Sequence, residues 1–394
     1  MRKCLFIFSL LLSLASFGQV TIKGKVIDSK SKKGIPFANL VDSGNRYGTS
    51  TDIDGSFTIN LPESVKQLWV SNVAYEKKQV SVSGKSLVIE LAPLAVDLQE
   101  LVVLPGVNPA HRIIEKASEN KWKNNPKKQT DFEVQSYSKL IATAYIEDSA
   151  SVFKEGWREM EDTNAVQALE FLEKQNIFLT ETASMLAFRR PSSIKEDVVA
   201  TRMSGFNNPI FTLVSSQMQS FSFYEDNIQV LDNSFLNPLS KGSTKQYLFI
   251  LQDSIPQGKD TVFVIQFKPR KGKNFKGLEG VLHIHSDGYG IESVQARPFD
   301  KIDDIKAEIR QRYEKRGSYW FPSQLNTRLV LETAIIEDWP VLLDGKTYFS
   351  APNTDPNLSS KDFRALSVEN IAKDAGKKGK KEMENYRVIP LTSK

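Results

Sequence analysis

Short runs that alternate apolar and polar residues fill most of this chain, and they constrain its fold more than any other feature. Residues 20–27 and 56–61 alternate in this way, and Asp54-Gly55 marks a tight turn before the second run. About seven such runs between residues 20 and 92 predict a β-sandwich. Longer runs follow at residues 131–145, 177–187, 194–203, 246–251, 262–267, 280–285, 291–296, 302–313 and 320–331.

These later runs are joined mostly by short connections, which favours an antiparallel sheet. The expected fold class is therefore mainly β: an N-terminal β-sandwich, then a larger, curved, mostly antiparallel sheet domain with a few helices. Asn108-Pro109 predicts the start of one helix, because asparagine is a good N-cap and proline suits the first helical position. That helix should end at residues 124–126, Asn-Asn-Pro. Residues 159–174 predict a second helix.

The first residues of the chain have the pattern of a secretory signal. Arg2 and Lys3 precede an apolar run over residues 5–17, which is too short to span a bilayer. Ser16-Phe17-Gly18 offers a cleavage site, so we expect a signal peptide over residues 1–18 and a mature chain that starts at Gln19. The single cysteine, Cys4, would be removed with the signal. The mature chain then excludes disulfides, thiolate metal sites and cysteine nucleophiles.

Charge and hydropathy narrow the classes of partner. The formal net charge is +5, from 52 Lys+Arg against 47 Asp+Glu, and it is spread along the chain. Nucleic-acid binding requires a concentrated basic face, so no nucleic-acid partner is expected. No further segment predicts a transmembrane helix after signal cleavage. The basic clusters at 268–276 and 377–381 predict solvated segments, and the second of them allows peripheral contact with anionic lipid.

Residues 20–92 carry a set of motifs with a family resemblance. The motifs are Gly24-x-Val26-x-Asp28, Gly34-Ile35-Pro36-x-Ala38-x-Leu40, Gly48-Thr49-x-Thr51-Asp52-x-Asp54-Gly55-x-Phe57 and Val73-Ala74-Tyr75-Glu76. They resemble the carboxypeptidase-regulatory-like (transthyretin-like) β-sandwich. In that family the sandwich is an accessory module without peptidase activity. The Asp52-x-Asp54-Gly55 sequence predicts a turn rather than an EF-hand, because the required acid would fall at Leu61.

A second set of motifs extends over the rest of the chain. They include Asn108-Pro109-Ala110-His111-Arg112, Glu133-x-x-Ser136-Tyr137-x-Lys139-Leu140, Glu181-Thr182-x-Ser184, Lys195-Glu196-x-x-x-Ala200-x-Arg202, Phe235-x-Asn237-Pro238-Leu239, Phe267-Lys268-Pro269-Arg270 and Tyr386-Arg387-x-Ile389-Pro390-Leu391-Thr392. This pattern resembles an uncharacterised family of Gram-negative outer-membrane proteins. In that family a regulatory-like sandwich precedes the β domain and a carboxy-terminal barrel follows it. Nothing after Tyr348 has the strand pattern of such a barrel, so a soluble or peripherally attached protein is expected.

Few residues are suited to catalysis or metal binding. The three histidines are His111, His283 and His285, and no His-Glu-x-x-His zinc motif occurs. His283-x-His285 is the best metal candidate, because alternation places both rings on one strand face. A polar strand face without metal is the favoured interpretation, and His111 is expected to be structural. We therefore assign no catalytic, cofactor-binding or metal residue and expect a protein that is not an enzyme.

Aromatic residues crowd the segment from Phe206 to Phe235, which also contains Phe211, Phe221, Phe223 and Tyr224. They are expected to pack in the core. The alternative is a loop that covers an apolar groove able to hold acyl chains, as in periplasmic carriers.

The expected organisation is a signal peptide (1–18), a regulatory-like sandwich (19–92), a linker (93–107), an antiparallel β domain with helical excursions (108–350) and a polar, charged tail (351–394). The expected function is a non-enzymatic accessory or binding role at the periplasmic side of the outer membrane, through contact with an envelope protein or lipid. The alternative is a barrel-less relative that acts as a structural or adhesion module. The expected location is the periplasm or the outer-membrane surface. A sizeable apolar groove in the second domain would favour the first hypothesis, and a filled core the second.

Overall fold

The computed structural model describes residues 19–94, 108–145, 176–205, 218–302, 304–336, 339–350, 352–363, 369–371 and 375–389. The predicted signal peptide and the predicted helix at 159–174 lie outside the described residues, as do Phe206, Phe211 and most of the predicted linker. By Cα proximity the chain divides into two compact units. Unit 1 takes in Met1–Val102 and Ser254–Val262, and unit 2 takes in Val103–Asp253 and Phe263–Lys394. Each unit is described by itself below.

Unit 1 contains the predicted two-layered β-sandwich. One sheet has the order β4-β1-β7 and the other β3-β2-β5-β6. Their bounds are β1 Gln19–Asp28, β2 Asn39–Asp42, β3 Gly48–Ser50, β4 Ser56–Pro62, β5 Gln67–Asn72, β6 Tyr75–Ser81 and β7 Ser86–Leu91. The core between the sheets includes Val26, Leu40, Leu68, Val70 and Leu91, all completely buried. Burying side chains of this size stabilises the fold by about 1.5–3 kcal/mol each.

Two glycines have clear roles in the sandwich, and one of them lies in the predicted turn at residues 52–55. Gly24 allows β1 and β7 to approach closely, since a Cβ there would lie 2.2 Å from the Leu87 carbonyl oxygen. At the predicted turn, Oδ1 of Asp52 accepts hydrogen bonds from the backbone N–H groups of Asp54 and Ser56, both at 2.9 Å. Gly55 has a φ of +80°, a conformation that favours glycine.

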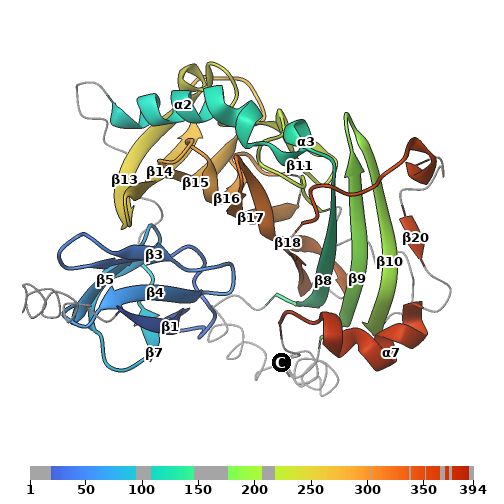
Figure 1. The fold of residues 1–394 in the computed structure, drawn as a ribbon, viewed down its shortest axis with the longest axis horizontal. Helices are drawn as coiled ribbons and strands as arrows, with labels where there is room; N and C mark the ends of the chain where they lie inside the picture. The colour runs from blue at the N-terminus through green and yellow to red at the C-terminus, as the bar shows by residue number, and fades with distance from the viewer. Residues whose placement is uncertain are drawn as a thin grey trace, which may run out of the picture. The chain divides into compact units, whose positions relative to one another are not determined.

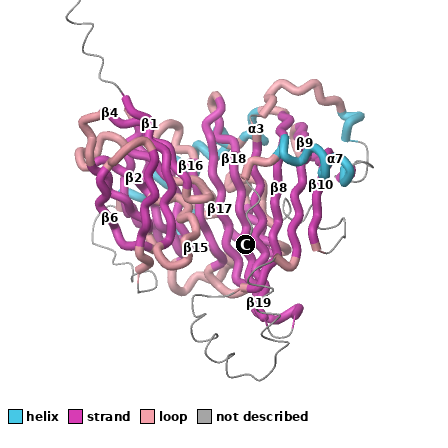
Figure 2. The backbone as a smooth tube through the Cα atoms, turned by 90° about the horizontal axis from the view of Figure 1, so that it is seen from below, coloured by secondary structure: helices cyan, strands magenta, loops and turns pink. Residues whose placement is uncertain are grey.

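Unit 2 is built on one large sheet (Figures 1 and 2). Its strand order is β13-β14-β15-β16-β17-β18-β19-β8-β9-β10-β20. All neighbours with a described register are antiparallel except β10 and β20, which are parallel. The bounds are β8 Phe132–Ala144, β9 Phe178–Arg189, β10 Ser193–Ser204, β13 Tyr247–Gln257, β14 Asp260–Pro269, β15 Leu278–His285, β16 Ile291–Pro298, β17 Ile305–Arg316, β18 Tyr319–Ile336, β19 Trp339–Phe349 and β20 Glu369–Ile371. The predicted mainly β fold class is confirmed.

Smaller elements accompany this sheet. They are α2 Pro109–Asn124, α3 Pro126–Gln129, the hairpin of β11 Asn227–Val230 and β12 Asn233–Leu236, the 3₁₀ turns η1 Ser243–Lys245 and η2 Ser360–Phe363, and α7 Ala375–Tyr386. Helix α2 begins and ends as its sequence predicts. The Asn108 side chain accepts a hydrogen bond from Ala110 N–H, and Asn125 is both the C-cap of α2 and the N-cap of α3.

The two faces of the large sheet differ in what covers them. We call the face that carries Leu140, Leu282, Ile309 and Leu329 the inner face, because these residues pack with buried residues of α2 in one apolar cluster. Figure 1 shows α2 and α3 running along the sheet on this side. The opposite side, which carries Glu181, His283 and Arg310, is the outer face.

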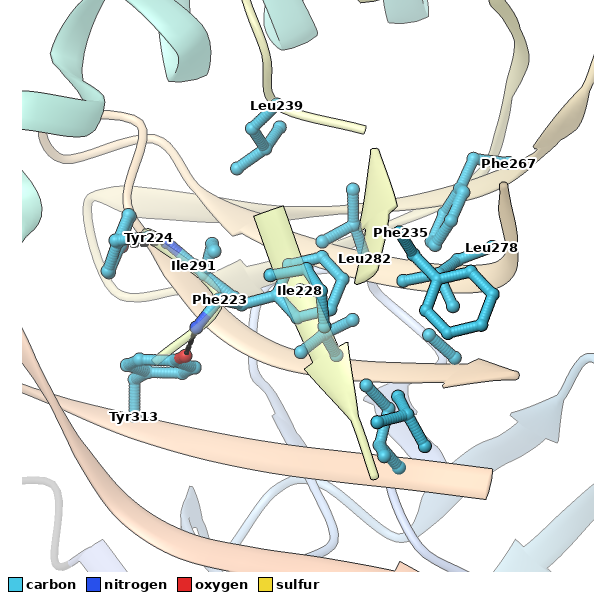
Figure 3. Packing of buried hydrophobic residues seen from close by; sticks show 14 of the residues in the cluster. Phe223, Tyr224, Ile228, Phe235, Leu239, Phe267, Leu278, Leu282, Ile291 and Tyr313 are labelled. Atoms are coloured by element: carbon cyan, nitrogen blue, oxygen red, sulfur yellow. Dashed lines mark hydrogen bonds between the residues drawn. The ribbon is translucent and has the colours of Figure 1, made fainter. Parts of the chain in front are cut away.

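Aromatic side chains fill a large part of the inner face. Phe223, Tyr224 and Phe235, which the sequence places in the crowded aromatic segment, are all buried there (Figure 3). The Tyr313 hydroxyl accepts a hydrogen bond from Phe223 N–H at 2.6 Å, and the Tyr224 hydroxyl accepts one from Ile291 N–H at 2.6 Å. These bonds satisfy polar groups that would otherwise be costly to bury. Core packing is therefore the role of Phe223, Tyr224 and Phe235.

The carboxy-terminal segment differs from its prediction as a solvated tail. Residues 375–386 form α7, which packs against β10 with Ala375 and Met383 buried. Gly379 lies so close to β10 that a Cβ would be 1.9 Å from the Thr201 carbonyl oxygen. Lys377 and Lys381 point to solvent, as their charge requires. The segment predicted to be solvated is thus part of a helix: Ala375, Gly379 and Met383, spaced four residues apart, form its buried face.

Candidate functional site: a hydroxyl band on the inner face

The inner face changes chemistry in the middle of strands β8 and β9. Along β8 the inward positions read Phe132 and Val134, then Ser136 and Ser138, then Leu140 and Ala142, since side chains alternate along a strand. Along β9 the residues paired with them read Phe188 and Leu186, then Ser184, Thr182 and Thr180, then Phe178. Each strand therefore has apolar residues at both ends and hydroxyl residues between them.

The same band continues onto β19, which lies beside β8, and onto β18, the next strand along the sheet. Thr347 of β19 pairs with Ser138, and Thr327 of β18 pairs with Gly345, which in turn pairs with Leu140. We call the seven hydroxyl residues the hydroxyl band: Ser136, Ser138, Thr180, Thr182, Ser184, Thr327 and Thr347. None is more than 4% exposed. Four neighbouring strands thus place seven buried hydroxyl groups on one side of the sheet.

Three hydroxyl groups of the band have no hydrogen-bond partner among the residues that the structure describes: Thr180 Oγ1, Ser184 Oγ and Thr327 Oγ1. Ser138 and Thr347, by contrast, are hydrogen-bonded to each other at 2.9 Å. Leaving a buried hydroxyl unpaired costs about 1–3 kcal/mol. Native proteins usually satisfy such groups with water or a bound molecule. The band is therefore suited to bind the polar part of a ligand.

An aromatic cluster borders one side of the band. Phe132 stacks on Phe188 with ring centroids 5.2 Å apart and meets Phe321 edge-on at 5.1 Å. Phe221 joins them, 5.8 Å from Phe132 and 5.4 Å from Phe349. The Lys127 ammonium of α3 lies 5.1 Å from the Phe221 ring centre, a favourable cation–π distance. The other side of the band borders the apolar cluster around α2.

The outer face behind the band carries a buried ionic cluster. Glu181 of β9 is 0% exposed and accepts hydrogen bonds from Tyr137 Oη at 2.7 Å and from Arg387 Nε and Nη2 at 2.7 and 2.8 Å. Burial opposes ionisation of Glu181, but the hydrogen bonds from Arg387 and Tyr137 outweigh it and lower its pKa. Burial and the bond to Glu181 raise the pKa of Tyr137. These three residues come from motifs far apart in the sequence, and the structure brings them together.

Lys139 pairs with Glu181 across β8 and β9 on the same face. It is 4% exposed, and burial lowers its pKa although Glu181 acts in the opposite direction. A further hydrogen-bonded row crosses β16 to β19: Gln295 donates to Glu308 at 2.5 Å, Arg310 to Asn326 at 3.0 Å, and Asn326 to Asp344 at 2.6 Å. Because the polar groups of this row bind one another, they are suited to hold the strands in register.

The histidines have structural surroundings. His283 lies on the outer face of β15 and is 3% exposed, so this strand is more buried than its sequence suggested. Burial, with the charge of Arg312, lowers the pKa of His283 to about 3. His285 packs against Trp320 with ring centroids 5.1 Å apart, and His111 meets Phe249 edge-on at 6.5 Å. Within the described ranges, no group of three His, Cys, Asp or Glu residues could hold a metal ion.

The hydroxyl band was not identified from the sequence. Its signal was present as alternation, since Ser136-x-Ser138 and Thr180-x-Thr182-x-Ser184 repeat hydroxyl residues at every second position. That period predicts a shared face, but it does not say whether the face points to solvent or to the interior.

Comparison with known proteins agrees with this two-part architecture. Residues 22–103 match the CarboxypepD_reg-like domain, so the chain combines a regulatory-like sandwich with a large β domain. Residues 113–335, more than half of the chain, match the family of unknown function DUF5686. The chain belongs to this family. The predicted resemblance, a regulatory-like sandwich followed by the β domain of an uncharacterised family, is confirmed.

No curated protein matches the chain. Among solved structures, it is similar to an outer membrane lipoprotein-sorting protein domain from Vibrio parahaemolyticus, with 10% identity, a TM-score of 0.31 and coverage of 65% of this chain and 97% of the other. A DUF1329 family protein from Desulfovibrio piger has 14% identity, a TM-score of 0.27 and coverage of 66% and 100%. Lipovitellin has 7% identity, a TM-score of 0.27 and coverage of 61% and 27%. TM-scores at this level establish no shared fold.

None of the described helices is long and apolar enough to cross a membrane.

Proposed function

We propose that this protein is a non-enzymatic binding module of the bacterial cell envelope, which acts at the periplasmic side of the outer membrane. The hydroxyl band carries this proposal. Three buried hydroxyl groups on one face of four strands have no partner among the described residues, and this arrangement suits a bound molecule that would satisfy them. The ligand we propose is an amphiphile, because aromatic residues border the band on one side and aliphatic residues on the other.

The signal-like residues at the start of the chain support the envelope location, since Arg2, Lys3 and the apolar run at 5–17 are typical of exported proteins. The proposed role involves no turnover. Glu181, the most buried carboxylate near the band, is held by Arg387 and Tyr137 and lies on the outer face, away from the hydroxyl groups. This geometry suits a structural ion pair rather than an acid or base.

A structural or adhesion module is the second candidate function. The observation that favours it is the tight packing of the rest of the inner face, where α2 and buried residues between Met218 and Leu239 form one apolar cluster. In this case the band would hold ordered water only, and the protein would act through its surface.

Native mass spectrometry of the full chain, purified without detergent from the envelope of the expressing bacterium, separates these functions. We expect an adduct of lipid-like mass on the wild-type protein. The triple variant Thr180→Val, Ser184→Ala, Thr327→Val keeps the side-chain volumes but removes the three hydroxyl groups, and it should lose the adduct.

Ser293→Ala is the matched control. The Ser293 hydroxyl is equally buried and also has no partner among the described residues, but it lies on the outer face. This variant should retain the adduct. A wild-type protein without any adduct, or an adduct that the triple variant retains in full, would reject binding at the band and favour the structural module.

A further inference from the structure

A surface cavity in the sandwich of unit 1 has the donor groups of an anion site. Its volume is about 400 Å³, and it lies between the turn after β2, the turn before β5 and the end of β6. Besides Asp42, the lining residues with polar side chains are Ser43, Arg46, Ser64, Lys66, Gln67 and Ser81, of which Gln67 already accepts a hydrogen bond from Gln79. Two cations and three hydroxyl groups therefore surround one space, and each can donate a hydrogen bond.

The only carboxylate among the lining residues, Asp42, is already used by the backbone. Its Oδ1 accepts hydrogen bonds from Arg46 N–H at 2.6 Å and Tyr47 N–H at 2.7 Å, and its Oδ2 accepts one from Gly44 N–H at 2.9 Å. Asp42 is buried and fixes the shape of the turn that presents Arg46. With the positive charges of Arg46 and Lys66 and the negative charge of Asp42, the lining has a net charge of +1.

Among the described residues, neither cation has a partner that neutralises it. Arg46 and Lys66 form no salt bridge with any residue of the described part of the chain. The Arg46 guanidinium lies 5.8 Å from the Tyr47 ring centre, which restricts its position without using its hydrogen-bond donors. Gly44 keeps the space beside this side chain open, since a Cβ there would lie 3.2 Å from Arg46 Nε.

We propose that this cavity binds an oxyanion, the carboxylate or phosphate group of a small molecule. The Arg46 guanidinium presents a planar pair of donors that matches two oxygens of such a group. Lys66 supplies a second charge from the neighbouring turn, and the serine hydroxyl groups supply neutral donors around them. The cavity belongs to unit 1, so this inference is independent of the proposed function of the hydroxyl band.

Isothermal titration calorimetry of the full mature chain tests the site, with sodium phosphate and sodium succinate as separate probes at constant ionic strength. We expect saturable binding with one site per chain for at least one probe, and the tighter probe identifies the preferred oxyanion. Arg46→Ala and Lys66→Ala should each weaken binding by about tenfold or more, because each removes a charge-assisted hydrogen bond.

Lys25→Ala is the matched control, because it removes one exposed positive charge from β1, in the other sheet of the sandwich. Its affinity should equal that of the wild type. Circular dichroism melting curves verify that all variants are folded, as expected for exposed side chains. Absence of saturable binding with both probes would overturn the proposal, and so would a loss of affinity in Lys25→Ala as large as in Arg46→Ala.

Discussion

Glu181 and Arg387 are 206 positions apart in the chain and form a two-pronged ion pair, with Oε1 to Nε at 2.7 Å and Oε2 to Nη2 at 2.8 Å. Glu181 is completely buried in the middle of β9, and Arg387 directly follows α7. The pair therefore ties the carboxy-terminal helix to the large sheet. Removing Arg387 would leave the buried Glu181 with Tyr137 and the neighbouring Lys139 but without the guanidinium that binds both of its oxygens.

The first prediction concerns this pair. Arg387→Ala should lower the free energy of unfolding of unit 2 by about 3–5 kcal/mol, because Glu181 then loses its counter-ion in a buried site. Urea denaturation followed by circular dichroism measures the loss. Arg190→Ala is the control, since Arg190 pairs with Asp131 at a half-exposed position. That variant should lose at most about 1 kcal/mol. Equal losses in both variants would contradict the buried role of Arg387.

The second prediction concerns pH. The folded protein lowers the pKa of His283 from 6.5 to about 3, so the unfolded chain binds a proton at this residue first as the pH falls. Its contribution to stability is complete above pH 6.5 and decreases progressively toward pH 3. Between pH 7 and pH 5 this should cost the wild type about 2 kcal/mol.

His283→Gln cannot gain this proton, so its stability should change less over the same interval. Urea unfolding of both proteins at pH 7 and pH 5 gives the comparison. The pKa of Glu181 is also lowered, but the resulting change in stability occurs below pH 4.5, the ordinary pKa of glutamate, and therefore outside this interval. Identical pH dependence of the two proteins would show that His283 is not buried in its neutral form.

The third prediction compares two positions in the hydroxyl band. In protein refolded from denaturant and free of bound molecules, Thr180→Val should raise the free energy of unfolding by about 1 kcal/mol, because it removes an unpaired buried hydroxyl. Ser138→Ala should lower it by about 1 kcal/mol, because the Ser138 hydroxyl is bonded to Thr347. Equilibrium urea unfolding measures both values. A destabilised Thr180→Val variant would contradict the absence of a partner at Thr180.

The fourth prediction uses two glycines of α7. Gly379→Ala should detach the helix from β10, because its Cβ would meet the Thr201 carbonyl oxygen at 1.9 Å. At Gly376 an added Cβ would have no atom within 4 Å, so Gly376→Ala should stabilise the helix by up to about 1 kcal/mol. Hydrogen exchange of the amides of residues 375–386 reports on docking. Faster exchange in Gly379→Ala and unchanged or slower exchange in Gly376→Ala are expected. The reverse order would contradict the packing of α7.

The sequence by itself determined the features that depend on neighbouring residues. Asn108-Pro109 and Asn125-Pro126 mark the ends of α2 because capping and proline geometry act within one turn. The alternation in residues 132–144 and 178–189 specified β8 and β9 and separated Tyr137 and Lys139 from Ser136 and Ser138. The Asp52-x-Asp54-Gly55 motif of the regulatory-like sandwich likewise forms a turn that local chemistry decides.

Only the tertiary structure decided which of these faces is buried and what meets on it. β19 was not predicted, since Pro340 and Gly345 weaken its strand pattern, yet it forms because β18 and β8 pair with it on both sides. α7 packs on β10 through Gly379. A glycine is needed there because the Thr201 backbone lies beside it, and the sequence does not show that contact. The hydroxyl band and the Glu181–Arg387 pair arise on opposite faces of the same strands. Contacts between residues this far apart depend on strand order and register, which local periodicity does not encode.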